Sequence, residues 1–288
     1  MLREVLRELF VPGGVLFVPF LVGCMGSVAF GIVGSYVTAR RLTSCAVAIS
    51  HSVLAGIGLA VFLRYHLQWP WCTPLLGAFL AAIVAALIIG RVTLRARHLG
   101  DSVTSSVMVI GMAVGLILLK KTPGYFEPMG ILFGDTLLVS ARDLWVIGCI
   151  DLLAVFCGTV FYRRLLAVCF DEEYARLRGL RTDAYYLLLL VMTALTVVAM
   201  MQIVGIIMVI ALLTLPSLTA LLFARKLWHC MVMSTLLCMA FVTVGLGVSF
   251  PTDLPSGPVI VMLAGTVFLL CSGAVHLHRT LRPSETEG

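Results

Sequence analysis

Ionisable residues inside long apolar stretches are the positions where this sequence could carry chemistry. His51 lies ten residues beyond Arg41, about 15 Å along a helix, which places it near the middle of an apolar stretch. An ionisable side chain in hydrocarbon costs about 2.5–3.5 kcal/mol, so its presence calls for a reason. A neutral imidazole at this depth can bind a transition-metal ion. Alternatively, His51 forms a hydrogen bond across a helix interface; both interpretations fit the spacing.

Two aspartates are the next candidates. Asp101 follows a cluster of three arginines and begins an apolar stretch. Its carboxylate would suit the first turn of a helix, where the backbone dipole favours negative charge, and it would also suit an ion path. Asp151 lies near the middle of a later apolar stretch, where it could pair with His51 or with another polar group. No motif supports a particular partner for Asp151.

The motifs of several enzyme classes are missing. The sequence contains no G-x-x-x-x-G-K-[ST], no H-E-x-x-H and no G-x-S-x-G. It therefore does not predict P-loop binding of a nucleotide, and it argues against a zinc intramembrane protease. Nine cysteines are present without a C-x-x-C pair, and most lie in apolar stretches, where cysteine behaves as a small hydrophobe. The sequence favours transport or a non-catalytic membrane scaffold, with an intramembrane hydrolase as the minor alternative.

Composition fixes the broad class of protein. Of the 288 residues, 61% are apolar and 12% are charged, whereas soluble proteins have roughly 45–50% and about 25%. These values exclude a soluble enzyme, a nucleic-acid binder and a disordered chain. The apolar residues form long unbroken runs, unlike the short alternating segments of a β-barrel. We therefore expect an all-α polytopic membrane protein.

Nine stretches are long enough, or nearly so, to cross roughly 30 Å of hydrocarbon as helices. Eight or ten spans are also compatible, because only Met200, Met201 and Gln202 separate the sixth stretch from the seventh. The expected spans are residues 15–37, 43–63, 74–90, 103–119, 144–162, 184–200, 203–223, 230–249 and 257–276.

Arginine and lysine clusters set the expected orientation. With nine alternating spans, the clusters after the first, third, fifth, seventh and ninth spans fall on one side, which is then cytoplasmic. The N-terminus is expected outside and the C-terminus inside; Lys120 and Lys121 are the one exception. We expect a short amphipathic segment at residues 1–14, a single membrane domain at 15–282 and a polar tail at 283–288.

Two polar connections stand out from the spans. Residues 170–181 have mixed charge on a helical pattern, with Gly179 as a C-cap signal. This segment is either a short cytoplasmic helix that docks a partner or a solvated connector. The outer loop at residues 252–258 contains two prolines and a glycine, and Pro258 suits the first turn of the next helix. A simple turn explains this loop as well as a gate does.

Several segments together resemble the permease subunits of the zinc/manganese/iron family of metal-uptake ABC transporters. They occur in family order from about residue 30 to residue 270. Each is a weak match by itself, and their order and spacing make the set strong. They are residues 34–41 and 50–56, Asp101 ahead of Gly111 and Gly115, residues 132–137, residues 170–175 with Gly179, residues 204–220, and residues 253–258.

The resemblance implies a permease subunit of a bacterial cytoplasmic (inner) membrane importer, surrounded by lipid and without enzymatic activity of its own. Two cytoplasmic ATPase subunits would use the ATP, a second permease chain, identical or paralogous, would complete the path, and an extracytoplasmic metal-binding protein would deliver the ion. A divalent zinc, manganese or iron ion would be the transported substrate. No permanently bound cofactor and no nucleic acid are expected.

The resemblance also assigns roles to residues. His51 and Asp101 match positions on the metal path. The family places an aspartate four residues before this histidine, whereas Val47 stands here, and Ala55 replaces the usual proline. An asymmetric pathway, with the aspartate supplied by a paralogous partner, would follow from Val47. The segment that couples to the ATPase comprises Asp171, Glu172, Glu173, Ala175 and Gly179, and the outer-side loop comprises Asp253, Pro255, Ser256 and Gly257.

Two rival transport functions remain at this level. A permease for a metal chelate, such as a siderophore, haem or cobalamin, would need a wider and less charged path. A secondary metal transporter would use an ion gradient and would import metal without ATP. Histidine and carboxylate ligands suit zinc, manganese and iron alike, so the sequence does not select the metal.

Overall fold

The computed structural model describes residues 17–69, 71–123, 141–252 and 254–281, and these residues contain helices and no strands. This confirms the expected all-helical membrane protein. The amphipathic segment at 1–14, the motif at 132–137, Asp253 and the polar tail at 283–288 lie outside the described residues.

Eight helices in the described ranges are long and apolar enough to cross a membrane. A ninth span follows if α7 (Ala141–Val160) and α8 (Tyr162–Phe170), which meet at a bend of 73°, are counted together. The prediction of about nine spans is therefore confirmed within its stated range. The eight are α2 (Phe17–Ala39), α3 (Thr43–His66), α4 (Pro74–Arg95), α5 (Gly100–Lys121), α10 (Thr182–Val204), α11 (Ile206–Phe223), α12 (Leu227–Thr252) and α13 (Ser256–Leu281).

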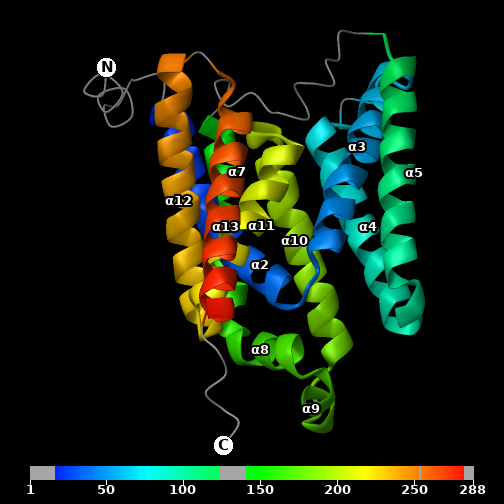
Figure 1. Cartoon of the computed structure of the whole chain (residues 1–288). Coiled ribbons are helices and arrows are strands. Elements are labelled where there is room, and N and C mark those ends of the chain that lie inside the picture. Colours follow the sequence, from blue (N-terminus) through cyan, green and yellow to red (C-terminus); the bar gives the residue numbers. More distant parts are fainter. Residues whose placement is uncertain (1–16, 70, 124–140, 253, 282–288) are drawn as a thin grey trace, which may run out of the picture.

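The helices form two groups with α10 between them (Figure 1). On one side α3 packs against α4 and α5, and on the other α2 packs against α7, α11 and α12. The central helix α10 contacts α4, α3, α2 and α11. The core is formed by large buried side chains such as Phe30, Tyr36, Ile49, Leu190 and Leu213. By contrast, α5 and α13 have only 17% and 11% of their spans buried in this chain.

The helix ends that carry the arginine clusters lie together. The α2–α3 turn, the α4–α5 connection with the short helix η1 (Arg97–Leu99), the α8–α10 segment, the α11–α12 connection and the end of α13 share one end of the bundle (Figure 1). We call this the arginine-rich end. Lys120 and Lys121 end α5 at the opposite end. The arrangement agrees with the sorting of the arginines, and the assignment of this end to the cytoplasm remains a prediction.

All four tryptophans of the sequence are exposed. Trp69 and Trp71 lie in the α3–α4 connection, Trp145 lies near the start of α7, and Trp228 is the second residue of α12. Tryptophan is enriched at the two membrane–water interfaces because its ring is apolar and its N–H is polar. The exposed tryptophans therefore mark both ends of the bundle.

The boundary between α10 and α11 differs from the prediction. The sequence places the break at Met200–Gln202, whereas α10 continues through these residues to Val204 and breaks at Gly205. Gly205 has φ 84° and ψ 159°, a conformation that is essentially restricted to glycine. Methionine and glutamine favour helix, so the polar amide of Gln202 was the wrong signal for a break and Gly205 was the right one.

Close backbone contact holds α3 to its neighbours. A Cβ atom on Gly56 of α3 would collide with the carbonyl oxygen of Gly77 on α4, and one on Gly77 would collide with that of Gly56. Gly58 and Gly115 make a similar contact between α3 and α5. Small residues at helix interfaces allow this approach, which supplies van der Waals packing where lipid offers no hydrophobic driving force. The position of α3 therefore depends on these glycines.

We expect Gly56→Leu to separate α3 from α4 and to destabilise the protein, at the upper end of the roughly 1–3 kcal/mol cost of overpacking. Thermal unfolding of the purified protein in detergent measures this loss. Gly265→Leu is the matched control, because no atom lies within 4 Å of a Cβ added there. Equal unfolding temperatures for the two variants would contradict the packing assignment.

Candidate metal path and docking surface

His51 lies on a partly exposed face of α3. Val47, His51 and Ala55 follow one another at intervals of four residues, and all three are partly exposed, whereas their neighbours in the helix are mostly buried. Residues four apart share one face of a helix. This face therefore presents one imidazole between two apolar side chains, and the carboxylate of a paired motif is missing at position 47.

His51 lies between two serines, one of which contacts α5. The Ser50 hydroxyl donates to the carbonyl of Ala46, 2.8 Å away, within α3. The Ser52 hydroxyl donates to the carbonyl of Ala48 at 2.7 Å and also reaches Val107 of α5 at 3.2 Å. These hydroxyls are satisfied by backbone carbonyls, so His51 is the residue of this segment that offers a metal ligand.

Asp101 lies in the first turn of α5 and is exposed. Thr104, one turn later, contacts Cys45 of α3 at 3.9 Å, and the two helices run in the same direction (Figure 1). From the rise of 1.5 Å per residue, Asp101 and His51 are separated by roughly 13 Å along the bundle. The structure therefore does not bring them into one site, and the described residues contain no group of three or more His, Cys, Asp or Glu that could hold a metal ion.

Asp151 does not pair with His51, which was one of the two possibilities that the sequence left open. Its Oδ1 accepts a hydrogen bond from the backbone N–H of Ala29 on α2, at 3.1 Å. The carboxylate thus joins α7 to α2, on the other side of α10 from α3 (Figure 1). The polar partner of Asp151 is a backbone amide, which no side-chain motif could have signalled.

The segment at 170–181 forms the short helix α9 (Glu172–Leu177) with a cap at each end. The Asp171 carboxylate accepts a hydrogen bond from the N–H of Tyr174 at 2.9 Å. At the other end Gly179 has φ 76°, and the Leu180 N–H donates to the Ala175 carbonyl at 3.1 Å. This is the Schellman arrangement, in which a left-handed glycine closes a helix. The predicted C-cap at Gly179 is confirmed.

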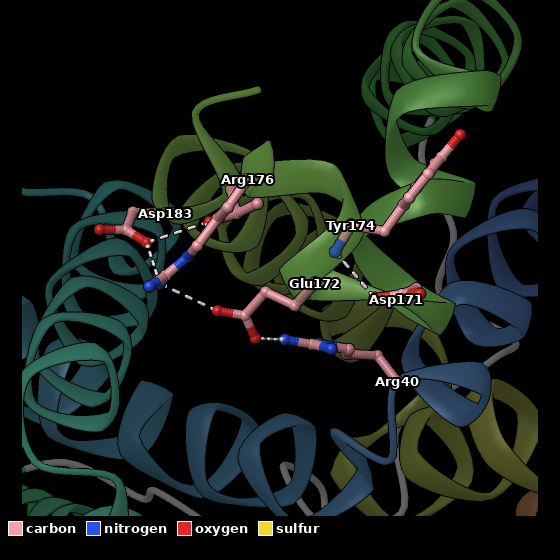
Figure 2. Close-up of polar contacts among 7 residues, drawn as sticks. Arg40, Asp171, Glu172, Tyr174, Arg176 and Asp183 are labelled. Carbon is pink, nitrogen blue, oxygen red and sulfur yellow. Dashed lines mark hydrogen bonds and ion pairs between the residues drawn. The ribbon is translucent and has the colours of Figure 1, made fainter. Parts of the chain in front are cut away.

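The inner face of α9 is anchored by charge (Figure 2). Glu172 accepts from Arg40 at 2.5 Å and from Arg176 at 2.9 Å. Arg176 also reaches Asp183 at 3.0 Å and the Thr182 hydroxyl at 2.9 Å, both in the first turn of α10. Ala175, on the inner side of α9, is fully buried. Four of the five coupling residues that the resemblance assigns, Asp171, Glu172, Ala175 and Gly179, therefore hold α9 in place, and Glu173 is exposed.

The outer face of the same segment is apolar. Phe170, Tyr174 and Leu177 are exposed, and Leu177 is 87% exposed. The Arg178 guanidinium lies 4.9 Å from the Tyr174 ring centre. We call Phe170, Tyr174 and Leu177 the docking face. Tyr174 and Leu177 lie three residues apart and share one face of α9, and Phe170 is the last residue of α8, just before it. Reasoning from charge missed these apolar residues.

The connection between α12 and α13 is shorter than the predicted outer loop. Pro255 is exposed, and Ser256 and Gly257 already belong to α13. Pro258 lies in the first turn of this helix, as predicted. The Leu254 N–H donates to the Ser249 carbonyl at 3.3 Å, and the Ser249 hydroxyl donates to the Leu254 carbonyl at 2.5 Å. The described part of this connection is thus a tight, hydrogen-bonded turn.

The fold defines a multi-pass helical membrane protein, with exposed apolar side chains on the segment around α9. The model of the ABC 3 transport family (ABC-3) matches residues 14–274. The chain therefore belongs to this family of membrane permease subunits, which are not themselves catalytic.

Similar proteins narrow the class to metal transport. A "Probable metal transport system membrane protein" of Chlamydia trachomatis is 37% identical over 93% of this chain and 90% of its own length. The "Manganese transport system membrane protein MntC" of Listeria monocytogenes is 29% identical over 83% of each chain. The structure of PsaBC from Streptococcus pneumoniae in complex with Fab aligns with a TM-score of 0.81 and 26% identity, covering 94% of this chain and 95% of that chain.

These findings confirm the resemblance seen in the sequence. The chain is a permease of a metal ABC transporter and a multi-pass protein of the bacterial inner membrane. The match at 34–56, which contains His51, and the match at 170–179, which contains α9, both lie inside the family region.

We expect Leu177→Ser to weaken binding of the expected ATPase subunit by about tenfold, because burial of a leucine side chain contributes about 1.5–3 kcal/mol and about 1.4 kcal/mol is a factor of ten. Co-purification of the complex and a titration of the ATPase against the permease in detergent measure the change. Leu254→Ser removes another exposed leucine, at the opposite end of the bundle, and serves as the control. If the two variants bind the ATPase with equal affinity, the docking face is not part of the interface.

Proposed function

We propose that this chain forms half of the membrane path of an ATP-driven importer for a divalent transition-metal ion. The family match over residues 14–274 carries the proposal. Two ATPase subunits bind at the arginine-rich end, a second permease chain completes the path, and an extracytoplasmic metal-binding protein delivers the ion at the opposite end. This placement makes the arginine-rich end cytoplasmic, in agreement with the sorting of arginine in membrane proteins.

His51 acts as a transient ligand in this proposal. Its imidazole is partly exposed and lies within the span α3, about 12 Å beyond Thr43 at the helical rise. A path must bind an ion well enough to admit it and weakly enough to release it. One imidazole without a neighbouring carboxylate is such a weak site, and residues of the second permease chain would complete it. Asp101 lies nearer the arginine-rich end and would meet the ion at a later stage.

Transport then follows from alternating access. ATP binding draws the two ATPase subunits together, and the docking face of α9 follows them. The helices that line the path change their packing between an outward-open and an inward-open arrangement, as in other domain rearrangements. The permease makes and breaks no covalent bond in this cycle.

Manganese is the first metal to test, because the Listeria relative carries manganese in its name; zinc and iron are the alternatives. Imidazole binds all three ions, so selectivity depends on the geometry of the complete site. A chelate permease would import a metal complex better than the free ion. A secondary transporter would import metal without ATP.

We expect purified complex in proteoliposomes to import metal only with ATP, and His51→Ala to lower the initial rate at least about tenfold, the lower end of the loss when support of a metal site is removed. Uptake of manganese, zinc and iron is compared by isotope or by elemental analysis. His66→Ala removes an exposed histidine near the end of the same helix and is the control. Normal import by His51→Ala would exclude His51 as a ligand and leave the family assignment intact.

We expect Val47→Asp to change the order of preference among the three metals. The new carboxylate would share the helix face of His51, one turn away, and would add a hard oxygen ligand. Competition between the metals in the uptake assay measures the preference, and Val47→Asn separates the effect of charge from that of shape. An uptake profile identical to that of the wild type would contradict a path along this face.

A further inference from the structure

The connection between α2 and α3 is a tight turn at the arginine-rich end. The Leu42 N–H donates to the Val37 carbonyl at 2.8 Å, and the Arg41 N–H donates to the Thr38 carbonyl at 3.1 Å. Arg41 has φ 58°, a left-handed conformation that is strained for a residue other than glycine. Such strain persists where surrounding contacts determine the backbone. The turn is therefore a short and conformationally restricted connection between α2 and α3.

Arg40, in this turn, forms an ion pair with Glu172, the first residue of α9. The two residues are 132 positions apart in the sequence, and their atoms are 2.5 Å apart. The side chains are only 21% and 14% exposed, so water screens the pair less than it would screen one at the open surface. Charge-assisted hydrogen bonds of this kind are short and directional.

The charges continue from α9 into α10. Arg176 contacts Glu172 on its own helix and Asp183 on α10 (Figure 2). The Arg40 guanidinium also lies 6.0 Å from the ring centre of Tyr186, on α10. The helix that carries the docking face is therefore connected on one side to the α2–α3 turn and on the other to the start of α10.

We propose that the Arg40–Glu172 pair transmits displacement of α9 to α3, the helix that carries His51. The proposal rests on the proposed function and adds the residues through which the ATPase reaches the metal path. A pull on Glu172 moves Arg40, and the tight turn passes the movement to Thr43, eight residues before His51. Apart from the pair, the main packing contacts of α9 are with α8 and α10. Arg40 and Glu172 are thus positioning residues.

If the Arg40–Glu172 pair only stabilises the fold, its loss has a different effect from that expected if it transmits movement. If the pair only stabilises the fold, its loss lowers the amount of intact complex and leaves the metal imported per ATP unchanged. If the pair transmits movement, the complex still assembles and hydrolyses ATP, and less metal is imported for each ATP. The ratio of import to hydrolysis therefore separates the two roles.

The experiment compares wild type, Arg40→Gln, Glu172→Gln and the double variant as complete transporter complexes in proteoliposomes. Assembly is followed by co-purification, ATP hydrolysis by phosphate release, and metal by uptake. Arg41→Gln, which alters the exposed neighbouring arginine, is the matched control. Each single variant is expected to assemble and to lower the import-to-hydrolysis ratio about fivefold or more, the lower end of typical coupling between distant sites. The double variant is expected to lose no more than either single variant.

Four outcomes would overturn the proposal. The ratio could stay normal in Arg40→Gln as in Arg41→Gln, the losses of the two single variants could multiply in the double variant, or Arg40→Gln could fail to retain the ATPase. Each of these would remove the transmission role and leave the proposed function standing. Absence of ATP-dependent uptake by the wild-type complex would instead overturn the proposed function, and the transmission role with it.

Discussion

Hydrocarbon strongly disfavours unpaired charges and unsatisfied backbone amides, and the rest of this structure depends on that penalty. It accounts for the helical conformation of the spans, because a helix satisfies its own amides. It also sorts the arginine clusters to helix ends that lie together at one end of the bundle. The ionisable side chains that remain within the spans are few, and each has an identifiable position. Asp151 is joined to a backbone amide of α2, whereas His51 lies on a partly exposed face of α3.

Within the membrane, close backbone contact takes the place of the hydrophobic effect in holding the helices together. The pairs Gly56–Gly77 and Gly58–Gly115 bring α3 into direct contact with α4 and α5. These contacts leave the face with Val47, His51 and Ala55 turned away from the buried core. The same helix therefore combines a rigidly packed side with a side that is available to an ion. This combination suits a path that must keep its ligand in place and still release the ion.

At the arginine-rich end the charges are arranged to hold a small helix. Six residues are too few for a stable isolated helix, so α9 depends on its caps at Asp171 and Gly179 and on the ion pairs of Glu172 and Arg176. Because Glu172 and Arg176 are turned toward these partners, the apolar side chains of Tyr174 and Leu177 remain exposed. The docking face is thus a consequence of the way in which α9 is anchored. The ion pairs of α9 reach the α2–α3 turn and α10, and so connect the docking face with the helix that carries the proposed metal ligand His51.

The sequence by itself determined what depends on composition and on local conformation. Long apolar runs specified the spans, Gly179 specified the end of α9, and Pro258 specified the first turn of α13. The order and spacing of several segments, which together span about residues 30–270, specified the family, and the family match over residues 14–274 confirmed it.

The tertiary structure decided what depends on contacts between distant residues. The approach of Arg40 to Glu172, across 132 positions, follows from the packing of whole helices, and so do the partner of Asp151 and the distance between His51 and Asp101. The sequence also misplaced the break at Gly205 and gave no sign of the 73° bend between α7 and α8. The local sequence pattern indicates whether a segment lies in lipid or in water. Which polar groups contact one another is determined only by the packing of the helices.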